Sequence, residues 1–142
     1  MLHWPVVIRA ASQEDLPAIA QIQSAAPEAS QWNPGDYLTF ECRVAEQDRS
    51  VVGFLVARPV AEREWEILNL AVAPQARRQG IGRQLLGDLV TRHPGAFFLE
   101  VRESNRAARR FYDRLGFREI TKRLQYYANP IESAIVMKLF SC

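Results

Sequence analysis

The hydrophobic positions of this chain follow two spacings, one typical of amphipathic helices and one typical of strands. Apolar residues three or four positions apart predict helices at residues 16–26, 81–90 and 107–115, with a short one at 37–40. The first helix has Ser12 as its N-cap and Asp15 in the capping-box position, and Gly116 follows the last as a left-handed C-cap. Short apolar runs predict strands at residues 6–9, 42–46, 51–57, 67–72, 96–101, 117–127 and 134–140.

The order of these elements predicts a mixed α/β fold. The strand at 67–72, the helix at 81–90 and the strand at 96–101 form a β-α-β unit, which places its strands parallel with a right-handed crossover. Residues 48–50 form a hairpin turn between two earlier strands. A length of 142 residues suits one core, so we expect residues 1–142 to form a single domain.

Charge divides the chain into an acidic and a basic half. Residues 1–71 carry five basic and ten acidic side chains, and residues 72–142 carry thirteen basic and six acidic ones. The basic half suits an anionic ligand, either a phosphorylated cofactor or a nucleic acid, although an ordinary solvated surface explains the count equally well. Hydrophobic residues make up 48% of the chain, which excludes a disordered or fibrous class.

Composition also bears on the compartment. No apolar run approaches the ~20 residues that span a bilayer, and residues 1–5 lack a signal-peptide pattern. The two cysteines, Cys42 and Cys142, lie far apart and have no partners at metal-ligand spacing. Neither His3 nor His93 has the neighbours of a catalytic triad. We therefore expect a reduced, cytoplasmic protein without a bound metal, and a disulfide between the two cysteines stays open.

The segment after residue 72 carries a phosphate-binding signal. Gly80 and Gly82 allow close approach of the backbone to an anion, Arg78 and Arg83 add charge, and the helix that follows presents free N–H groups. A dinucleotide-binding fingerprint would need a glycine where Leu85 stands, and the Gly-Lys-Ser/Thr of a P-loop does not occur. The alternative is a plain turn with solvated arginines.

Two blocks of the sequence resemble the GNAT superfamily of N-acetyltransferases, and together they cover about residues 67–139. The first runs from Val72 and Pro74 through residues 77–82 to Leu85 and Leu86. The second comprises residues 99–105 and 107–117. With the tail after Tyr126, the chain is especially similar to the ribosomal-protein-alanine N-acetyltransferase (RimI-like) branch. It departs from the usual pattern at Ala73 and Ser133, where acidic residues are common.

The resemblance implies the acyl-CoA N-acyltransferase fold, with a twisted, mostly antiparallel sheet, one splayed parallel pair and flanking helices. It also implies acetyl-CoA as the co-substrate and no metal. The Val72 N–H would be free to polarise the thioester carbonyl, the amides of residues 78–83 would hold the pyrophosphate, and Asn105 would contact the pantetheine arm. The cofactor-binding residues predicted in this way are Leu70, Ala71, Val72, Arg77, Arg78, Gln79, Gly80, Ile81, Gly82, Arg83 and Asn105.

Glu100 and Tyr112 are the predicted catalytic residues. Glu100 interrupts a run suited to burial on both faces, so its carboxylate needs a partner, a wet cleft or a shifted pKa. From the residues alone, a structural pair with an arginine and a catalytic group are equally supported, and Tyr112 fits a core aromatic. The resemblance implies that Glu100 is the general base and Tyr112 the general acid, with direct attack of the amine in a ternary complex.

Tyr126, Tyr127 and Glu132 match the loop that admits the peptide in this branch. The expected acceptor is therefore the N-terminal α-amine of a protein such as a ribosomal protein, whose basic tail the acidic first half would attract. A small amine, such as a polyamine or an antibiotic, is the alternative acceptor. An alternative of another class is an RNA- or ribosome-binding module, but we favour the enzyme and expect neither membrane nor nucleic acid as partners. The cationic face of such a module would consist of Arg106, Arg109, Arg110 and Arg114, but we favour a face that is solvated or partly serves the 3′-phosphate of the cofactor.

Overall fold

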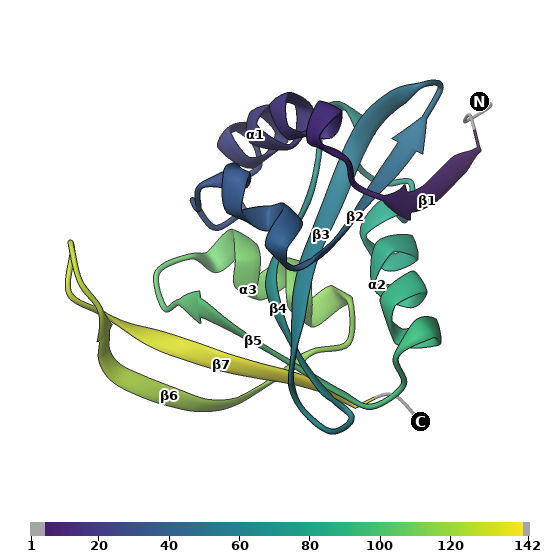
Figure 1. Ribbon diagram of the computed structural model, residues 1–142. Coiled ribbons are helices and arrows are strands. Elements are labelled where there is room, and N and C mark those ends of the chain that lie inside the picture. The colour runs from purple at the N-terminus through teal and green to yellow at the C-terminus, as the bar shows by residue number, and fades with distance from the viewer. Residues whose placement is uncertain (1–4, 141–142) are drawn as a thin grey trace.

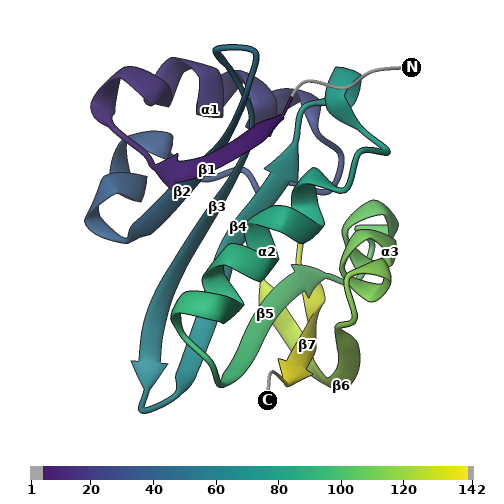
Figure 2. The same ribbon diagram turned by 90° about the vertical axis from the view of Figure 1, so that its right-hand side faces the viewer.

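The computed structural model describes residues 5–140, which form one mixed sheet with helices on both faces (Figures 1 and 2). Within these residues the strand order is β1-β2-β3-β4-β5-β7-β6. The strands are β1 (Val6–Ala10), β2 (Glu41–Gln47), β3 (Ser50–Ala61), β4 (Glu64–Val72), β5 (Ala96–Arg102), β6 (Arg118–Tyr127) and β7 (Glu132–Phe140). The helices are α1 (Leu16–Ala25), α2 (Ile81–Arg92) and α3 (Arg106–Arg114), with 3₁₀ turns η1 (Gln13–Asp15), η2 (Pro34–Thr39) and η3 (Pro74–Ala76).

The parallel pair β4–β5 is short and then opens. Pairing runs only from Glu64 opposite Ala96 to Glu66 opposite Phe98, while every other neighbouring pair is antiparallel. On the other edge of β4, Leu68 is an extra residue in the register with β3, and such a bulge bends and twists a strand. Figure 1 shows β5 and the β6–β7 hairpin turning away from β4. The predicted fold, including its splayed parallel pair, is therefore confirmed.

Helices cover the two faces of the sheet unequally. On one face, η2 packs on β3, with the rings of Tyr37 and Phe54 stacked at 5.8 Å. The opposite face carries α2 and α3 (Figure 2). Within the described residues, the β5–β7–β6 part of the sheet has no helix on the η2 face. Burial therefore alternates along β5, where Phe97 and Leu99 are buried while Phe98 and Glu100 are partly exposed. The expectation that this run is buried on both faces is wrong.

Three predicted elements differ from those observed. β3 and β4 continue beyond the apolar runs and meet at a turn at Arg63. Their outer ends carry exposed residues, such as Arg58 and Glu64, so hydrophobic patterning does not detect them. The expected second helix is a 3₁₀ turn that starts earlier, at Pro34, where the Asn33 side chain accepts a 3.0 Å hydrogen bond from the Gly35 N–H. The hairpin turn before β3 is confirmed, and Asp48 in it has a φ of 50°.

The described residues also bear on the expectations about compartment. Cys42 is buried in β2, and desolvation raises the pKa of its thiol to about 12. Cys142 and His3 lie outside the described residues. His93 stacks on Trp65 with 4.3 Å between ring centroids, so it has a packing role. Across residues 5–140, helices are too short or too polar to cross a membrane.

Candidate active site

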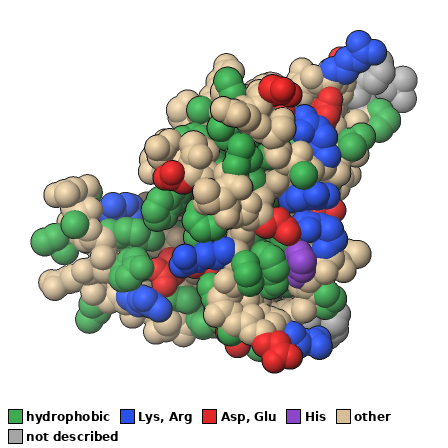
Figure 3. Space-filling model, viewed as in Figure 1, with side chains coloured by type: hydrophobic (Ala, Val, Ile, Leu, Met, Phe, Trp, Pro, Cys, Tyr) green, Lys and Arg blue, Asp and Glu red, His purple; other side chains and the backbone are tan. Residues whose placement is uncertain are grey.

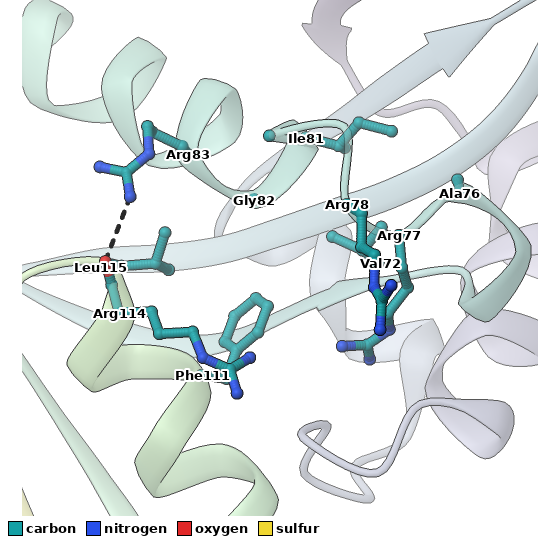
Figure 4. Close-up of a pocket in the computed structure, with 11 residues that line it drawn as sticks. Val72, Ala76, Arg77, Arg78, Ile81, Gly82, Arg83, Phe111, Arg114 and Leu115 are labelled. Atoms are coloured by element: carbon teal, nitrogen blue, oxygen red, sulfur yellow. Dashed lines mark hydrogen bonds between the residues drawn. The ribbon is translucent and has the colours of Figure 1, made fainter. Parts of the chain in front are cut away.

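A cavity of about 580 Å³ opens between the N-terminal end of α2 and α3. Figure 4 shows Arg77 and Arg78 on one side of it, and Phe111 and Arg114 on the other. A Cβ at Gly82 would lie 3.1 Å from the Phe111 ring, so this close approach of α2 to α3 favours glycine. The lining residues are Val72, Ala76, Arg77, Arg78, Gly80, Ile81, Gly82, Arg83, Phe111, Arg114 and Leu115.

The cavity fits an anion. Gly80 precedes α2 with a φ of 75°, a conformation that favours glycine, and nothing lies within 4 Å of the place where its Cβ would be. The first N–H groups of α2 have no acceptor within the helix and carry the positive end of its dipole. Arg78, Arg83 and Arg114 add positive charge to the same cavity. These donors and charges suit a diphosphate group.

Seven of the eleven predicted cofactor residues line this cavity, from Val72 to Arg83, and four do not. Leu70 and Ala71 are fully buried, backbone included. The Gln79 side chain accepts a hydrogen bond from Gln47 at 2.7 Å. Asn105 caps α3 by accepting from the Ala108 N–H at 3.0 Å. For these four residues, a ligand contact stays a prediction.

Ala76, Phe111, Arg114 and Leu115 line the cavity but were not among the predicted cofactor-binding residues. The helical stripe of α3 already contained Phe111 and Leu115, and its basic face contained Arg114. Sequence spacing alone does not show which of these residues face α2. The hydrogen bond from Arg83 Nη2 to the Arg114 carbonyl oxygen, 3.2 Å long, ties the two helices together beside the cavity (Figure 4).

The end of β4 is occupied by a carboxylate that the sequence did not reveal. The Val72 N–H donates a 3.1 Å hydrogen bond to Oε2 of Glu28, and the other carboxylate oxygen of Glu28 pairs with Arg77. The Glu28 residue is only 2% exposed. The expectation of a free amide at Val72 is therefore wrong in this structure, because a side chain from the loop after α1 satisfies it.

A polar cluster fixes that loop on β4. The Asn69 amide, itself buried, donates to the Ser30 carbonyl at 2.8 Å and accepts from the Ser30 N–H at 3.0 Å. It also donates to the hydroxyl of Tyr37 at 3.0 Å and to the side chain of Gln23 at 3.1 Å. Buried polar groups that are satisfied in this way hold one conformation. Ser30 is thereby held on β4, and this contact fixes the position of Glu28, two residues earlier in the loop.

Tyr112 lies in the core and also close to this carboxylate. Its ring meets Phe111 and Phe117 edge to face, at 5.3 Å and 5.6 Å between centroids. Desolvation raises the pKa of its phenol, and the negative charge of Glu28 raises it further. Tyr112 belongs to α3, and the Glu28 carboxylate reaches the end of β4 from the loop after α1. Both interpretations of Tyr112, core aromatic and site residue, agree with this position.

Glu100 lies on the uncovered face of β5 and is paired. Its Oε1 is 3.3 Å from Nε of Arg123, and its side chain is 18% exposed. The charge of Glu100 is the main cause that raises the pKa of Tyr126, and the Arg123 guanidinium lies 5.4 Å from the Tyr126 ring. Figure 3 shows acidic and basic side chains side by side between the α1–η2 part of the molecule and the β6–β7 hairpin. The pair with an arginine exists, and the carboxylate stays partly accessible to solvent.

The other two predicted acceptor residues make internal contacts. Glu132 accepts hydrogen bonds from the Ser104 N–H at 2.7 Å and from Arg102 Nη1 at 3.2 Å. The Arg102 guanidinium lies 4.4 Å from the Tyr127 ring, and burial raises the pKa of Tyr127 to about 12. These contacts fasten the β6–β7 hairpin to the end of β5. Their role in acceptor binding stays a prediction.

The arginines of α3 do not form one continuous cationic face. Arg109 pairs with Glu119 at 3.0 Å, and Arg114 lines the cavity described above. Arg106 and Arg110 line a separate hollow that also contains Asp113. Acidic groups thus interrupt the surface that an RNA-binding module would use.

The fold and the site are those of an acetyl-CoA-dependent acyltransferase, and comparison with known sequences identifies the family. The sequence model of the Acetyltransferase (GNAT) family matches residues 8–117, and the chain belongs to this family. It is 39% identical to the ribosomal protein bS18-alanine N-acetyltransferase of Salmonella typhimurium over 142 aligned residues, covering 90% of this chain and 93% of the relative. The corresponding protein of Escherichia coli K12 is 37% identical, with 88% and 90% covered.

Solved structures agree with this assignment. The crystal structure of the ribosomal-protein-S18-alanine N-acetyltransferase from Escherichia coli superposes with a TM-score of 0.75 at 32% identity, covering 95% of this chain and 93% of that one. Ard1 from Thermoplasma volcanium superposes with a TM-score of 0.82 at 27% identity, with 96% and 98% covered.

Proposed function

We propose that this chain transfers the acetyl group of acetyl-CoA to the N-terminal α-amine of a protein, by direct attack within a ternary complex. The observation that carries this proposal is the cationic, glycine-lined cavity at the start of α2, placed beside the splayed strands β4 and β5. One side of the splay offers an anion site, and the other side offers the partly exposed carboxylate of Glu100.

The residues of the cavity would bind and orient the co-substrate. Acetyl-CoA supplies the acetyl group as a thioester, which is activated toward attack by an amine. The amides at the start of α2, with Arg78 and Arg83, would hold its diphosphate. The Val72 N–H, at the end of β4, is the proposed donor to the carbonyl oxygen, where negative charge develops during attack.

Glu100 and Tyr112 would move the protons. An α-amine has a pKa of about 7.7–8.0, so near neutrality much of it is protonated and unreactive. The carboxylate of Glu100, directly or through water, would accept that proton. Tyr112 would donate a proton to the departing thiolate, and its raised pKa keeps the phenol protonated.

The acceptor side of the proposal rests on relatives and on charge. The two curated relatives are named for the alanine of ribosomal protein bS18, and we propose the same class of acceptor here. Glu66 and Glu100 both contribute negative charge near Tyr126 on the uncovered face. That charge suits a cationic N-terminus followed by basic residues. A small amine would find less of this surface to contact.

An acetylation screen tests the proposal. The protein is incubated with acetyl-CoA and peptides that begin with Ala, Ser or Met, and in parallel with polyamines and with peptides whose only amine is a lysine side chain. We expect N-terminal acetylation, with alanine preferred and with basic downstream residues improving kcat/KM. Turnover of polyamines at higher kcat/KM than of any peptide would favour the small-amine alternative. Absence of calorimetric heat with acetyl-CoA would contradict the enzyme itself.

A further inference from the structure

The buried carboxylate of Glu28 has no role in the reaction described above. It lies on the loop between α1 and η2 and is 2% exposed, yet neither a helix end nor a core network accounts for it. Burying a carboxylate costs several kcal/mol unless it is paired and hydrogen-bonded. Two partners of Glu28 offset this cost: the Val72 N–H, at 3.1 Å, and the guanidinium of Arg77.

Both partners of Glu28 belong to the site proposed for acetyl-CoA. Val72 is the proposed donor to the thioester carbonyl, and Arg77 lines the anion cavity, where a diphosphate would compete for its guanidinium. A ligand that engages these two groups takes them from Glu28. The carboxylate then remains at the end of β4 without its cationic partner, a state that favours binding of another cation.

We propose that Glu28 is a positioning residue that couples the two substrate sites by holding the α-ammonium of the acceptor when Val72 and Arg77 engage acetyl-CoA. This inference rests on the proposed function, because it uses the ligand assigned there. The acceptor amine fits the required chemistry, since it is a cation with N–H donors. Glu28 holds the ammonium, and the proton acceptor remains Glu100.

The position of Glu28 supports this role. Ser30, two residues on, is held to Asn69 on the face of the sheet that η2 covers, and Glu100 lies on the same face of β5. The charge of Glu28 acts on the Tyr112 phenol. Glu28 therefore contacts the proposed oxyanion donor, Val72, and acts electrostatically on the proposed acid. No other carboxylate of the described residues contacts Val72.

Coupling of this kind is reciprocal. If acetyl-CoA frees the carboxylate that binds the acceptor, the acceptor strengthens binding of acetyl-CoA by the same factor. The Glu28→Gln variant keeps an oxygen that accepts from Val72 and removes the charge, so its effect isolates the ionic part. Arg77→Gln instead keeps the charge of Glu28 and removes the Arg77 guanidinium that pairs with it.

Isothermal titration calorimetry measures the coupling without turnover. The co-substrate probe is acetonyl-CoA, an unreactive ketone analogue, and the acceptor probe is a short peptide beginning with alanine. For the wild-type protein, we expect acetonyl-CoA to tighten peptide binding at least about tenfold. CoA without the ketone should tighten it less. In Glu28→Gln the tightening should fall below about twofold, while acetonyl-CoA still binds alone.

Two further variants make the outcome decisive. Glu41→Gln also removes a carboxylate from a partly buried ion pair, with Arg92, but far from the cavity, and should keep the full coupling. Arg77→Gln should tighten peptide binding in the absence of acetonyl-CoA and reduce the coupling, which tests the idea even if Glu28→Gln does not fold. Wild-type coupling that is absent, or that Glu28→Gln and Arg77→Gln leave unchanged, overturns the inference alone. A wild-type protein that does not bind acetonyl-CoA overturns the proposed function as well.

Discussion

Arg123 reaches across the intervening strand β7 to place its Nε 3.3 Å from Oε1 of Glu100. The arginine side chain is 56% exposed, and an ion pair of this kind contributes about 0.2–1 kcal/mol or less. The proposed base is thus held by a cation that water, or another cation, can replace. If Glu100 accepts the proton of the acceptor amine, as proposed, the Arg123 guanidinium competes with that proton for the carboxylate.

Replacing Glu100 by glutamine should remove the proposed base and keep the shape of the site. We expect kcat for an alanine-initiated peptide to fall about 100-fold or more, because general-base catalysis contributes about 10²–10⁴-fold. Binding of acetyl-CoA, measured by calorimetry, should stay unchanged, since Glu100 does not line the cavity. Full turnover in Glu100→Gln would contradict the role of Glu100 as the base and would leave it only a structural role, as the partner of Arg123.

Removing the competing cation should favour the acceptor. In Arg123→Gln we expect the KM for the peptide to fall by up to about fivefold, the factor that corresponds to an exposed ion pair, with kcat retained. Lys122→Gln is a matched control, because Lys122 pairs instead with Glu103 at 2.5 Å. A KM that rises in Arg123→Gln would mean that Arg123 binds the acceptor.

Tyr112→Phe tests the proposed acid. Phenylalanine keeps the ring contacts with Phe111 and Phe117 and removes the hydroxyl, so we expect a similar Tm and a kcat about 100-fold lower. The raised pKa of Tyr112 also predicts a pH dependence. A tyrosine with an ordinary pKa is half deprotonated near pH ~10. Because the pKa of Tyr112 is raised, its phenol stays protonated, and wild-type kcat should stay level between about pH 8 and pH 10. A decline over that range, absent in Tyr112→Phe, would contradict the raised pKa.

The β-α-β unit could be predicted because its signals are local. An apolar run, Pro74, two glycines with arginines and a helical stripe follow one another within residues 67–101. The residues that pair β4 with β5 were nevertheless missed. Glu64 is exposed and Glu66 is partly exposed, so hydrophobic patterning placed the start of the strand at Ile67. Pairing with β5, however, involves only residues 64–66 of β4.

Glu28 could not be predicted for a different reason. It is a single carboxylate in a loop, and its partners Val72 and Arg77 are 44 and 49 residues away in the sequence. No periodicity connects positions at such separations, and only the packing of the loop on Asn69 brings them together. The same limit applies to Arg123, whose contact with Glu100 depends on strand order and not on spacing.

The capping-box acid Asp15 gives a prediction about stability, because its contacts lower its pKa. The hydrogen bonds from Arg9 and Ser12, each 2.8 Å, lower that pKa from 3.8 to about 2, with Arg9 the main cause. A carboxylate with a lowered pKa stabilises the fold above its ordinary pKa, and the contribution is lost as the pH falls toward the folded value. We therefore expect Asp15→Asn to reduce the free energy of unfolding by about 1–2 kcal/mol at pH 7. Urea titrations should show this difference shrinking between about pH 4 and pH 2. The control Asp113→Asn, in an exposed pair with Arg118 at 3.4 Å, should change stability by less than about 0.5 kcal/mol at any pH. A difference for Asp15→Asn that stays constant with pH would assign the loss to the amide itself, not to the charge.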